Sequence, residues 1–344
     1  MKRAQVAAAA FVAAFACIVL AQAGPYKVLK TAKVGGTGGF DYVFADADGR
    51  RLYVPRSGAG ARISVFNLDT LEPVGEIANT NAHGAAVDPK TNHGFASGKP
   101  VPMWDTKTLA LIKTIDVQGG PDGIIFEPFS ERVFVFSHTP PHATVIDAKD
   151  GSVAGMIADL GGAPEQAAFD GKGRLYVAIE DKNTIAVVDV KTLAVTTHYD
   201  LAGKGGVCAG LALDNKNHVL FAACRNPQAM VMLDANDGKV ITSLPIGSGT
   251  DGAAFNPATM EAFSSQGDGT LAVVKEKSPT EFTVEQNVQT QVSAKTMTFD
   301  SKTGHIFLIA AEYGAAPAPP PAGGRGGGRG PMLPDSFSIL VVGK

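Results

Sequence analysis

Short apolar runs joined by small polar turns recur along the chain at a regular spacing. The stretch GPDGIIFEPFSERVFVF at 120–136 shows the unit, in which a polar turn joins two apolar runs. The polar residue that ends the first run recurs at intervals of 42, 39, 43, 44, 42 and 44 residues, at Asp46, Asp88, Glu127, Asp170, Asp214, Asn256 and Asp300. An aromatic residue of the second run keeps the same step, at Tyr53, Phe95, Phe134, Tyr176, Phe221, Phe263 and Phe307. Two series in register indicate seven copies of one structural unit.

Each copy holds four strand-like runs. A third run, such as IAVVD, follows the first two, and a weaker fourth run, such as VITSL, follows the third. Four short strands in about 40 residues are typical of one blade of a β-propeller. Turns such as DADG and DNKN supply the residues with which a hairpin reverses. We therefore predict an all-β fold, a seven-bladed β-propeller with four antiparallel strands per blade.

The seventh copy lacks a fourth run, because the chain stops after SFSILVV. Residues 26–34, YKVLKTAKV, precede the first marker and have no partner in the first copy. We predict that this N-terminal strand pairs beside the strand at 336–342 and closes the last blade. Such a closure leaves no open sheet edge in that blade.

The first 23 residues differ in kind from the repeats. Lys2 and Arg3 precede an apolar run at 7–20, which ends in the small residues AQA. This pattern is typical of a secretory signal with its cleavage site. The alternative, a membrane anchor, needs roughly 20 apolar residues. We expect a signal peptide at 1–23 and one exported propeller domain at 24–344, periplasmic or secreted, with no membrane span after cleavage.

Composition and charge narrow the partners. Hydrophobic residues make up 45% of the chain and charged residues 18%, which suits a large buried core and excludes disorder. The formal net charge is −3, and loss of Lys2 and Arg3 would make it −5. Only Arg325 and Arg329 come close to a basic patch, so we do not expect nucleic-acid binding. These arginines belong to a Pro/Gly/Arg-rich loop at 314–335, which is either a flexible segment or a contact for an anionic partner.

Two stretches carry a family resemblance. Residues 50–77 (RRLYVPRSGAGARISVFNLDTLEPVGEI) and 173–195 (GRLYVAIEDKNTIAVVDVKTLAV) resemble the YVTN β-propeller repeat, and the chain as a whole resembles YncE-like exported propellers. The resemblance implies a seven-bladed fold whose repeat residues build blades, in a family that largely lacks an assigned activity. The sequence departs from the pattern at Pro55 and in the seventh copy, where no Asp closes the third strand.

One position in each copy points to a binding site. The innermost strands of a propeller line its central channel. The residue five positions before each marker falls where that strand begins, at Asp41, His83, Asp122, Glu165, Ala209, Asp251 and Lys295. We expect the six polar side chains to surround one channel mouth as candidate ligand-binding residues. His83, Asp122 and Glu165 are the candidate ligands of a divalent cation. The alternative is that each side chain caps backbone amides of its own turn.

A further histidine joins this set. His138 lies in SHTPPHA with His142, just after the second strand of the third copy, where the chain returns to the face of Asp122. Imidazole suits transition metals, so His138 is a candidate ligand beside His83. A solvent-exposed loop histidine is the alternative.

Cys208 and Cys224 are the two cysteines beyond the leader. The turn at 214–217 places them within one residue of facing each other across a hairpin. Exported proteins meet oxidising conditions, which favours a disulfide. Two free thiols packed as small apolar groups are an equally acceptable interpretation.

The chain shows no nucleophile elbow, His-Glu-x-x-His pair or Walker-type lysine loop. We therefore expect an exported non-enzymatic binding or scaffold protein, a monomer that uses the channel mouth for a small molecule or a protein or peptide partner. The alternative is a metal-assisted hydrolase or lyase with a carboxylate and histidine site at the central channel, by analogy with lactonase and lyase propellers.

Overall fold

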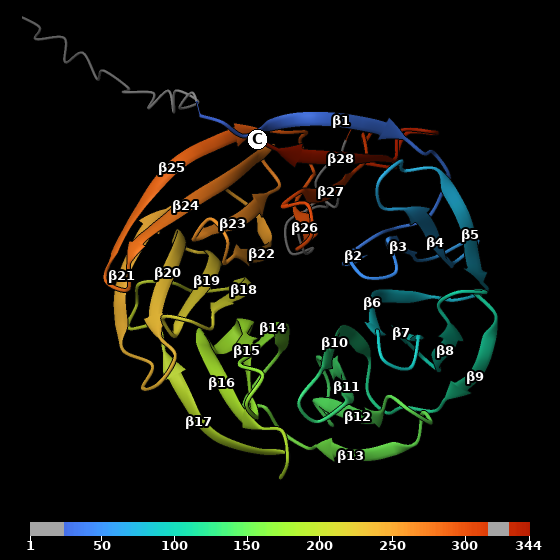
Figure 1. Ribbon diagram of the computed structural model, residues 1–344, viewed down its shortest axis with the longest axis horizontal. Coiled ribbons are helices and arrows are strands. Elements are labelled where there is room, and N and C mark those ends of the chain that lie inside the picture. The colour runs from blue at the N-terminus through green and yellow to red at the C-terminus, as the bar shows by residue number, and fades with distance from the viewer. Residues whose placement is uncertain (1–23, 316–329) are drawn as a thin grey trace, which may run out of the picture.

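The computed structural model describes residues 24–315 and 330–344, and its strands form seven four-stranded antiparallel sheets arranged in a ring (Figure 1). The sheets are numbered as blades in chain order. Blades 1 to 3 consist of β2 (Phe44–Asp46), β3 (Arg51–Arg56), β4 (Arg62–Asn67) and β5 (Pro73–Ala78); β6 (Ala82–Asp88), β7 (His93–Gly98), β8 (Val101–Asp105) and β9 (Leu111–Ile115); β10 (Pro121–Glu127), β11 (Arg132–Ser137), β12 (Ala143–Asp147) and β13 (Val153–Ile157).

The remaining blades follow the same order from the channel outward. Blades 4 to 6 consist of β14 (Pro164–Phe169), β15 (Arg174–Ile179), β16 (Thr184–Asp189) and β17 (Ala194–Asp200); β18 (Cys208–Asp214), β19 (Val219–Arg225), β20 (Gln228–Asp234) and β21 (Val240–Pro245); β22 (Thr250–Asn256), β23 (Glu261–Gln266), β24 (Thr270–Ser278) and β25 (Glu281–Gln289). Between β15 and β16 lies a single turn of 3₁₀ helix, η1 (Glu180–Lys182), the one helical element among the described residues. The predicted seven-bladed all-β fold is confirmed.

The last blade joins the two ends of the chain. It holds β26 (Thr296–Phe299), β27 (Ile306–Ala310), β28 (Ser338–Gly343) and, outermost, β1 (Lys27–Lys33). β1 runs antiparallel to β28, with Ala32 opposite Ile339, so the two lie side by side at the rim of the ring (Figure 1). The predicted closure by the N-terminal strand is confirmed.

The aromatic series of the sequence forms the packing between blades. None of its seven members is more than 2% exposed. Tyr53 of blade 1, for example, packs against Trp104 of blade 2 with ring centroids 5.6 Å apart. Burying one such side chain contributes roughly 1.5–3 kcal/mol, which explains why every copy of the repeat carries one.

The polar residues that end the first strand of each blade have a different structural role. Asp88, Asp214 and Asp300 each accept a hydrogen bond from the backbone N–H two residues later, at 2.9–3.0 Å. These carboxylates hold the turn between the first two strands of a blade. They therefore build the fold and lie apart from the channel mouth.

Two of the expected segments fall largely outside the described residues. The signal peptide predicted at 1–23 lies outside them, as does the 316–329 part of the loop predicted at 314–335. Tyr313 pairs with Met332 in an isolated bridge where that loop leaves and rejoins blade 7. Within residues 24–315 and 330–344, no helix has the length and apolar character that crossing a membrane requires.

Candidate functional site

The innermost strands of blades 2 to 6 each begin with a β-bulge. Pairing with the second strand slips by one residue at His83, at Asp122, at Glu165, at Ala209 and at Asp251, which lie inside the five bulges. A bulge adds a residue to one strand and redirects its side chain. Ser97 and Ser137 brace the first two bulges by accepting hydrogen bonds from Gly84 N at 2.8 Å and from Gly120 N at 2.9 Å.

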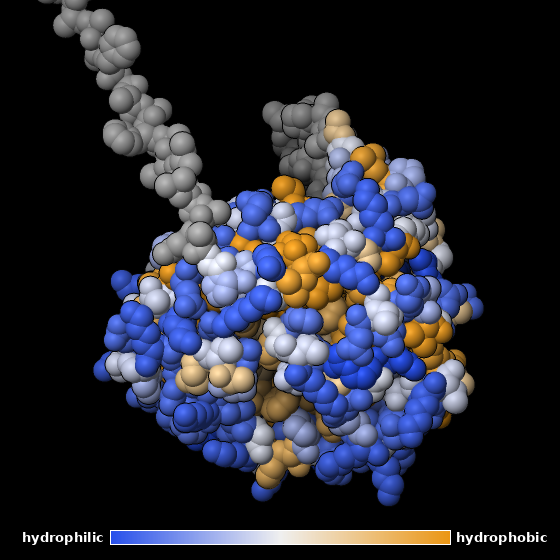
Figure 2. Space-filling view, turned by 45° about the horizontal axis from the view of Figure 1, so that its top comes forward, coloured by the Kyte–Doolittle hydropathy of each residue, from blue (hydrophilic) through white to orange (hydrophobic). Residues whose placement is uncertain are grey.

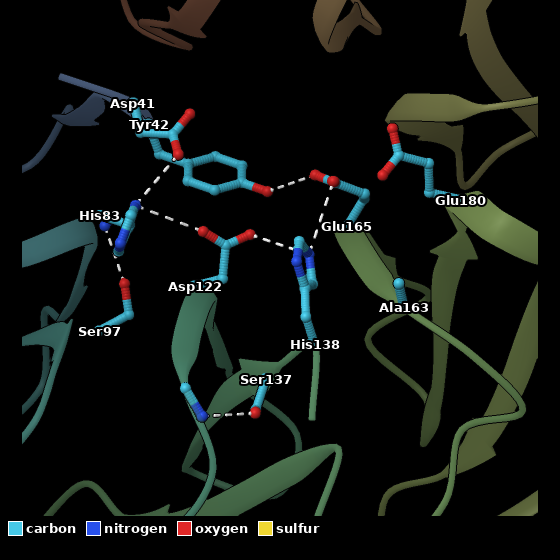
Figure 3. A network of polar contacts seen from close by, with 12 residues as sticks. Asp41, Tyr42, His83, Ser97, Asp122, Ser137, His138, Ala163, Glu165 and Glu180 are labelled. Carbon is cyan, nitrogen blue, oxygen red and sulfur yellow. Dashed lines mark hydrogen bonds and ion pairs between the residues drawn. The ribbon is translucent and has the colours of Figure 1, made fainter. Parts of the chain in front are cut away.

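Five of the predicted residues meet at the channel mouth (Figure 3). His83 Nδ1 lies 3.2 Å from Asp41 Oδ2 and 3.4 Å from Asp122 Oδ1. His138 Nε2 lies 3.2 Å from Asp122 Oδ2 and 3.6 Å from Glu165 Oε1. The Asp122 carboxylate therefore sits between the two imidazoles and offers one oxygen to each, and the set forms two His and carboxylate triads that share Asp122.

The side chain of Tyr42 extends across the channel mouth towards Glu165. Its hydroxyl donates a hydrogen bond of 2.9 Å to Glu165 Oε2, which links blade 1 to blade 4 (Figure 3). Gly84 and Gly123 lie beside it, since a Cβ built at either glycine would be in van der Waals contact with Tyr42, at 3.4 Å from its Cβ and 3.6 Å from its hydroxyl. Burial raises the pKa of Tyr42 well above its usual value, so the phenol stays protonated as a donor.

The opposite side of the mouth is an ion-pair cluster. Asp251 accepts hydrogen bonds from Arg225 and from Lys295, and Arg225 also pairs with Glu180. Two cations therefore already neutralise the Asp251 carboxylate, whose side chain is only 8% exposed. The ring predicted from the sequence is thus divided. Asp251 and Lys295 belong to this ion-pair cluster, whereas the two triads contain the other four polar members of the ring, Asp41, His83, Asp122 and Glu165.

Three residues of the triads have raised pKa values, so they keep their protons to higher pH than usual. The hydrogen bond to Asp122 raises the pKa of His138 to about 9. Burial raises the pKa of Glu165 to about 8, against the hydrogen bond from Tyr42, which lowers it. The hydrogen bond to Asp41 likewise raises the pKa of His83. At pH 7 the triads hold protons that a cation would have to displace.

Three residues at the mouth were not among those predicted from the sequence: Tyr42, Glu180 and Arg225. A signal for two of them was present in the sequence. In blades 3, 4 and 5, the residue four positions after the buried aromatic is His138, Glu180 and Arg225, respectively. This second ring lies where the second strand of a blade ends beside the first. Tyr42 has no such signal, since it follows Asp41 outside any strand.

His142 lies elsewhere. It is 7% exposed, and its Nδ1 accepts a hydrogen bond of 2.9 Å from Leu160 N, beside Asp159 at 3.1 Å. This histidine therefore ties the outer part of blade 3 to the strand connection that follows it.

The two cysteines face each other in blade 5. Cys208 of β18 and Cys224 of β19 are direct partners in the pairing register, and the structure joins them in a disulfide. The bulge at Ala209 removes the one-residue offset expected from the turn at 214–217. Both cysteines are almost completely buried.

Beneath the mouth the channel contains a cavity of about 380 Å³. Tyr42 and Glu165 line it at the mouth, and its wall is formed mostly by apolar side chains of the innermost strands, with Gln166 and Thr298 as further polar members. In the space-filling view, hydrophilic residues cover most of the face shown and apolar residues lie in the depression near its centre (Figure 2). The site therefore combines a polar mouth with an apolar shaft.

The sequence matches no protein-family model and no curated protein. The fold is similar to the solved structure of the RRP9 WD40 repeats, with a TM-score of 0.71 and 10% identity over 94% of this chain and 99% of that one. It is also similar to U3-55K (TM-score 0.71, 10% identity, 93% and 99% covered) and to a chain of the Mitotic Checkpoint Complex (0.71, 11%, 89% and 96%). At such low identity these likenesses support the β-propeller fold alone.

Proposed function

We propose that this protein is an exported binding protein whose channel mouth binds a pair of divalent transition-metal cations. One cation is held by Asp41, His83 and Asp122, and the other by Asp122, His138 and Glu165. The propeller fold suits a binding role, and the observation that carries the proposal is the placement of Asp122 between the two imidazoles. A mixed set of imidazole and carboxylate donors is typical of zinc and related cations.

Proton counting supports a cation at each triad. A ring nitrogen carries at most one proton. His83 Nδ1 nevertheless faces oxygens of both Asp41 and Asp122, and His138 Nε2 faces oxygens of both Asp122 and Glu165. The proton of one ring nitrogen points best at one oxygen, whereas a cation among the three ligand atoms would contact all of them.

The donor separations fit such an ion. Nitrogen and oxygen ligands lie about 2.0–2.2 Å from zinc, so two ligands on one ion are about 3.0–3.5 Å apart at tetrahedral or right angles. The four nitrogen to oxygen separations in the triads are 3.2, 3.4, 3.2 and 3.6 Å. Small side-chain shifts would therefore bring the three ligand atoms of each triad onto one ion.

Metal stoichiometry tests this proposal. Titration of the metal-free chain with Zn²⁺, followed by calorimetry, is expected to show two ions per chain. His83→Ala and His138→Ala should each keep one ion, and Asp122→Asn should lose tight binding of both. His198→Ala is the matched control, because that imidazole contacts Leu160 O in the outer part of blade 4. Wild-type stoichiometry in Asp122→Asn, or no tight binding by the wild type, would contradict the proposal.

The export, the family and the partner belong to the same proposal. The leader at 1–23 supports a periplasmic or secreted location, and the stretches at 50–77 and 173–195 support membership of the YVTN, YncE-like propellers. The net charge of −3 disfavours nucleic acid as a partner. We take the functional unit to be a monomer with its ligand at the channel.

A metal-assisted hydrolase or lyase is the second candidate. Paired cations about 3.5–4 Å apart are the arrangement of many hydrolases, and a shared carboxylate is a natural bridge between them. Glu165 strengthens this candidate, because its pKa of about 8 suits proton transfer near neutral pH. Zn²⁺-dependent hydrolysis of a lactone that is abolished by Asp122→Asn would favour this candidate over binding alone.

A further inference from the structure

The channel below the mouth is apolar where a solvent-filled channel would be polar. Six large side chains of its wall come from blades 1, 3, 4 and 7: Phe44, Ile125, Phe126, Phe169, Met297 and Phe299. All except Met297 are only partly buried. Leaving apolar surface in water costs about 25 cal/mol per Å², so an apolar wall in an open channel indicates a ligand that covers it.

The shaft begins where the cation ligands end. Tyr42 and Glu165 line the cavity, and their hydrogen bond spans its polar end. Glu165 also belongs to the triad of Asp122 and His138. A molecule lying in the shaft would therefore present one end to the second cation, in contact with an apolar wall along the rest of its length.

The net charge at the mouth determines which chemical group of the bound molecule can face the cation. With two divalent cations bound, four positive charges face the three carboxylates of Asp41, Asp122 and Glu165. Each cation also has only three protein ligands in its triad, which leaves a position for an oxygen of the bound molecule. Without the cations, the anionic end of a bound molecule would have no metal ion to coordinate at this end of the shaft.

Resting on the proposed cation pair, we propose that the shaft binds the hydrocarbon part of a small carboxylic acid whose carboxylate coordinates the cation at the mouth. A volume of about 380 Å³ lies within the usual range for small-molecule sites. At about 30 Å³ per water-sized group it accommodates roughly a dozen non-hydrogen atoms. Octanoate, with ten, is the natural probe.

Calorimetric titration of octanoate into the Zn²⁺-loaded full chain tests the proposal, with the zinc content measured in the same sample. Binding is expected to strengthen by about fourfold for each CH₂ added from butanoate to octanoate. The metal-free chain should not bind octanoate. Equal binding with and without zinc, or preferential binding of octylamine by the metal-free chain, would overturn the assignment of a carboxylate.

A shaft variant separates this proposal from the cation site. Ala254 lines the cavity from blade 6, away from all five cation ligands. Ala254→Phe should keep two zinc ions and lose at least tenfold in octanoate affinity, and Ala254→Leu provides a milder change if the larger one impairs folding. Ala258→Phe, in an exposed turn of the same blade, is the matched control. Unchanged octanoate affinity in both Ala254 variants would refute the shaft while leaving the cation pair intact, whereas absence of zinc from the wild type would refute both.

Discussion

The Tyr42 hydroxyl donates a hydrogen bond of 2.9 Å to Glu165 across the mouth of the central channel. Tyr42 precedes the first strand of blade 1 and Glu165 lies in β14 of blade 4, so this bond crosses the channel mouth (Figure 3). It marks the boundary between the two His and carboxylate triads and the apolar shaft. Glu165 belongs to both sides of that boundary, since it is a member of one triad and lines the cavity.

Cation binding should release protons. Glu165, with a pKa of about 8, and His138, with a pKa of about 9, must both lose protons before they can act as ligands. Zinc affinity is therefore expected to rise between pH 6 and pH 9. Calorimetry at pH 7 in buffers with different heats of ionisation should show two to three protons released per chain, because His83, whose pKa is also raised, contributes beside Glu165 and His138. A pH-independent affinity across this range would contradict the assignment of these two ligands.

Glu165 should also make the metal-free fold less stable as the pH rises. Its pKa is about 8 in the folded chain against a reference of 4.5, so between these values the folded state binds a proton that the unfolded state lacks. The resulting stabilisation is complete below pH 4.5 and is lost as the pH rises to 8. Relative to Glu165→Gln, the wild type is expected to lose roughly 2–4 kcal/mol of unfolding free energy over this window. The unfolding free energies of the two proteins are measured by urea denaturation at each pH. A difference between them that does not change with pH would argue against a raised pKa of Glu165.

Asp251 should matter for stability and not for cation binding. Its carboxylate is buried and pairs with Arg225 and Lys295. Asp251→Asn removes the carboxylate that Arg225 and Lys295 share, although Arg225 keeps its pair with Glu180, and losing hydrogen bonds to a charged group typically costs about 1.5–3 kcal/mol. We expect a destabilisation of that order in denaturant and an unchanged count of two zinc ions. Loss of zinc in this variant would show that both halves of the mouth form one site.

The disulfide between Cys208 and Cys224 predicts a simple chemical result. Denatured but unreduced chain of residues 24–344 should contain no thiol that reacts with Ellman's reagent. Replacing both cysteines with alanine should lower the unfolding free energy by at most about 3 kcal/mol, because the closed loop is short and the hairpin already restrains it. Two reactive thiols per chain would show that the bridge is not formed.

The repeat made the fold predictable from the sequence, because each blade needs a turn-building carboxylate or amide and a buried aromatic at fixed places. Asp88 and Phe95 fulfil these two roles in blade 2. The site was less predictable, since a bulge has no local signal: the one at Ala209 shifts the register by one residue and brings Cys208 opposite Cys224. Side-chain partners across the ring were also hidden, and Asp251 was expected among the ligand-binding residues before its pairing with Arg225 was known.

Anomalous diffraction from crystals of the chain soaked in Zn²⁺ tests the central claim most directly. We predict two peaks at the zinc edge about 3.5–4 Å apart, one between Asp41, His83 and Asp122 and the other between Asp122, His138 and Glu165. The Asp122→Asn protein, treated in the same way, should show neither peak at full occupancy. Zinc bound only at other residues, or a mouth without zinc at concentrations that saturate the chain in solution, would contradict the account.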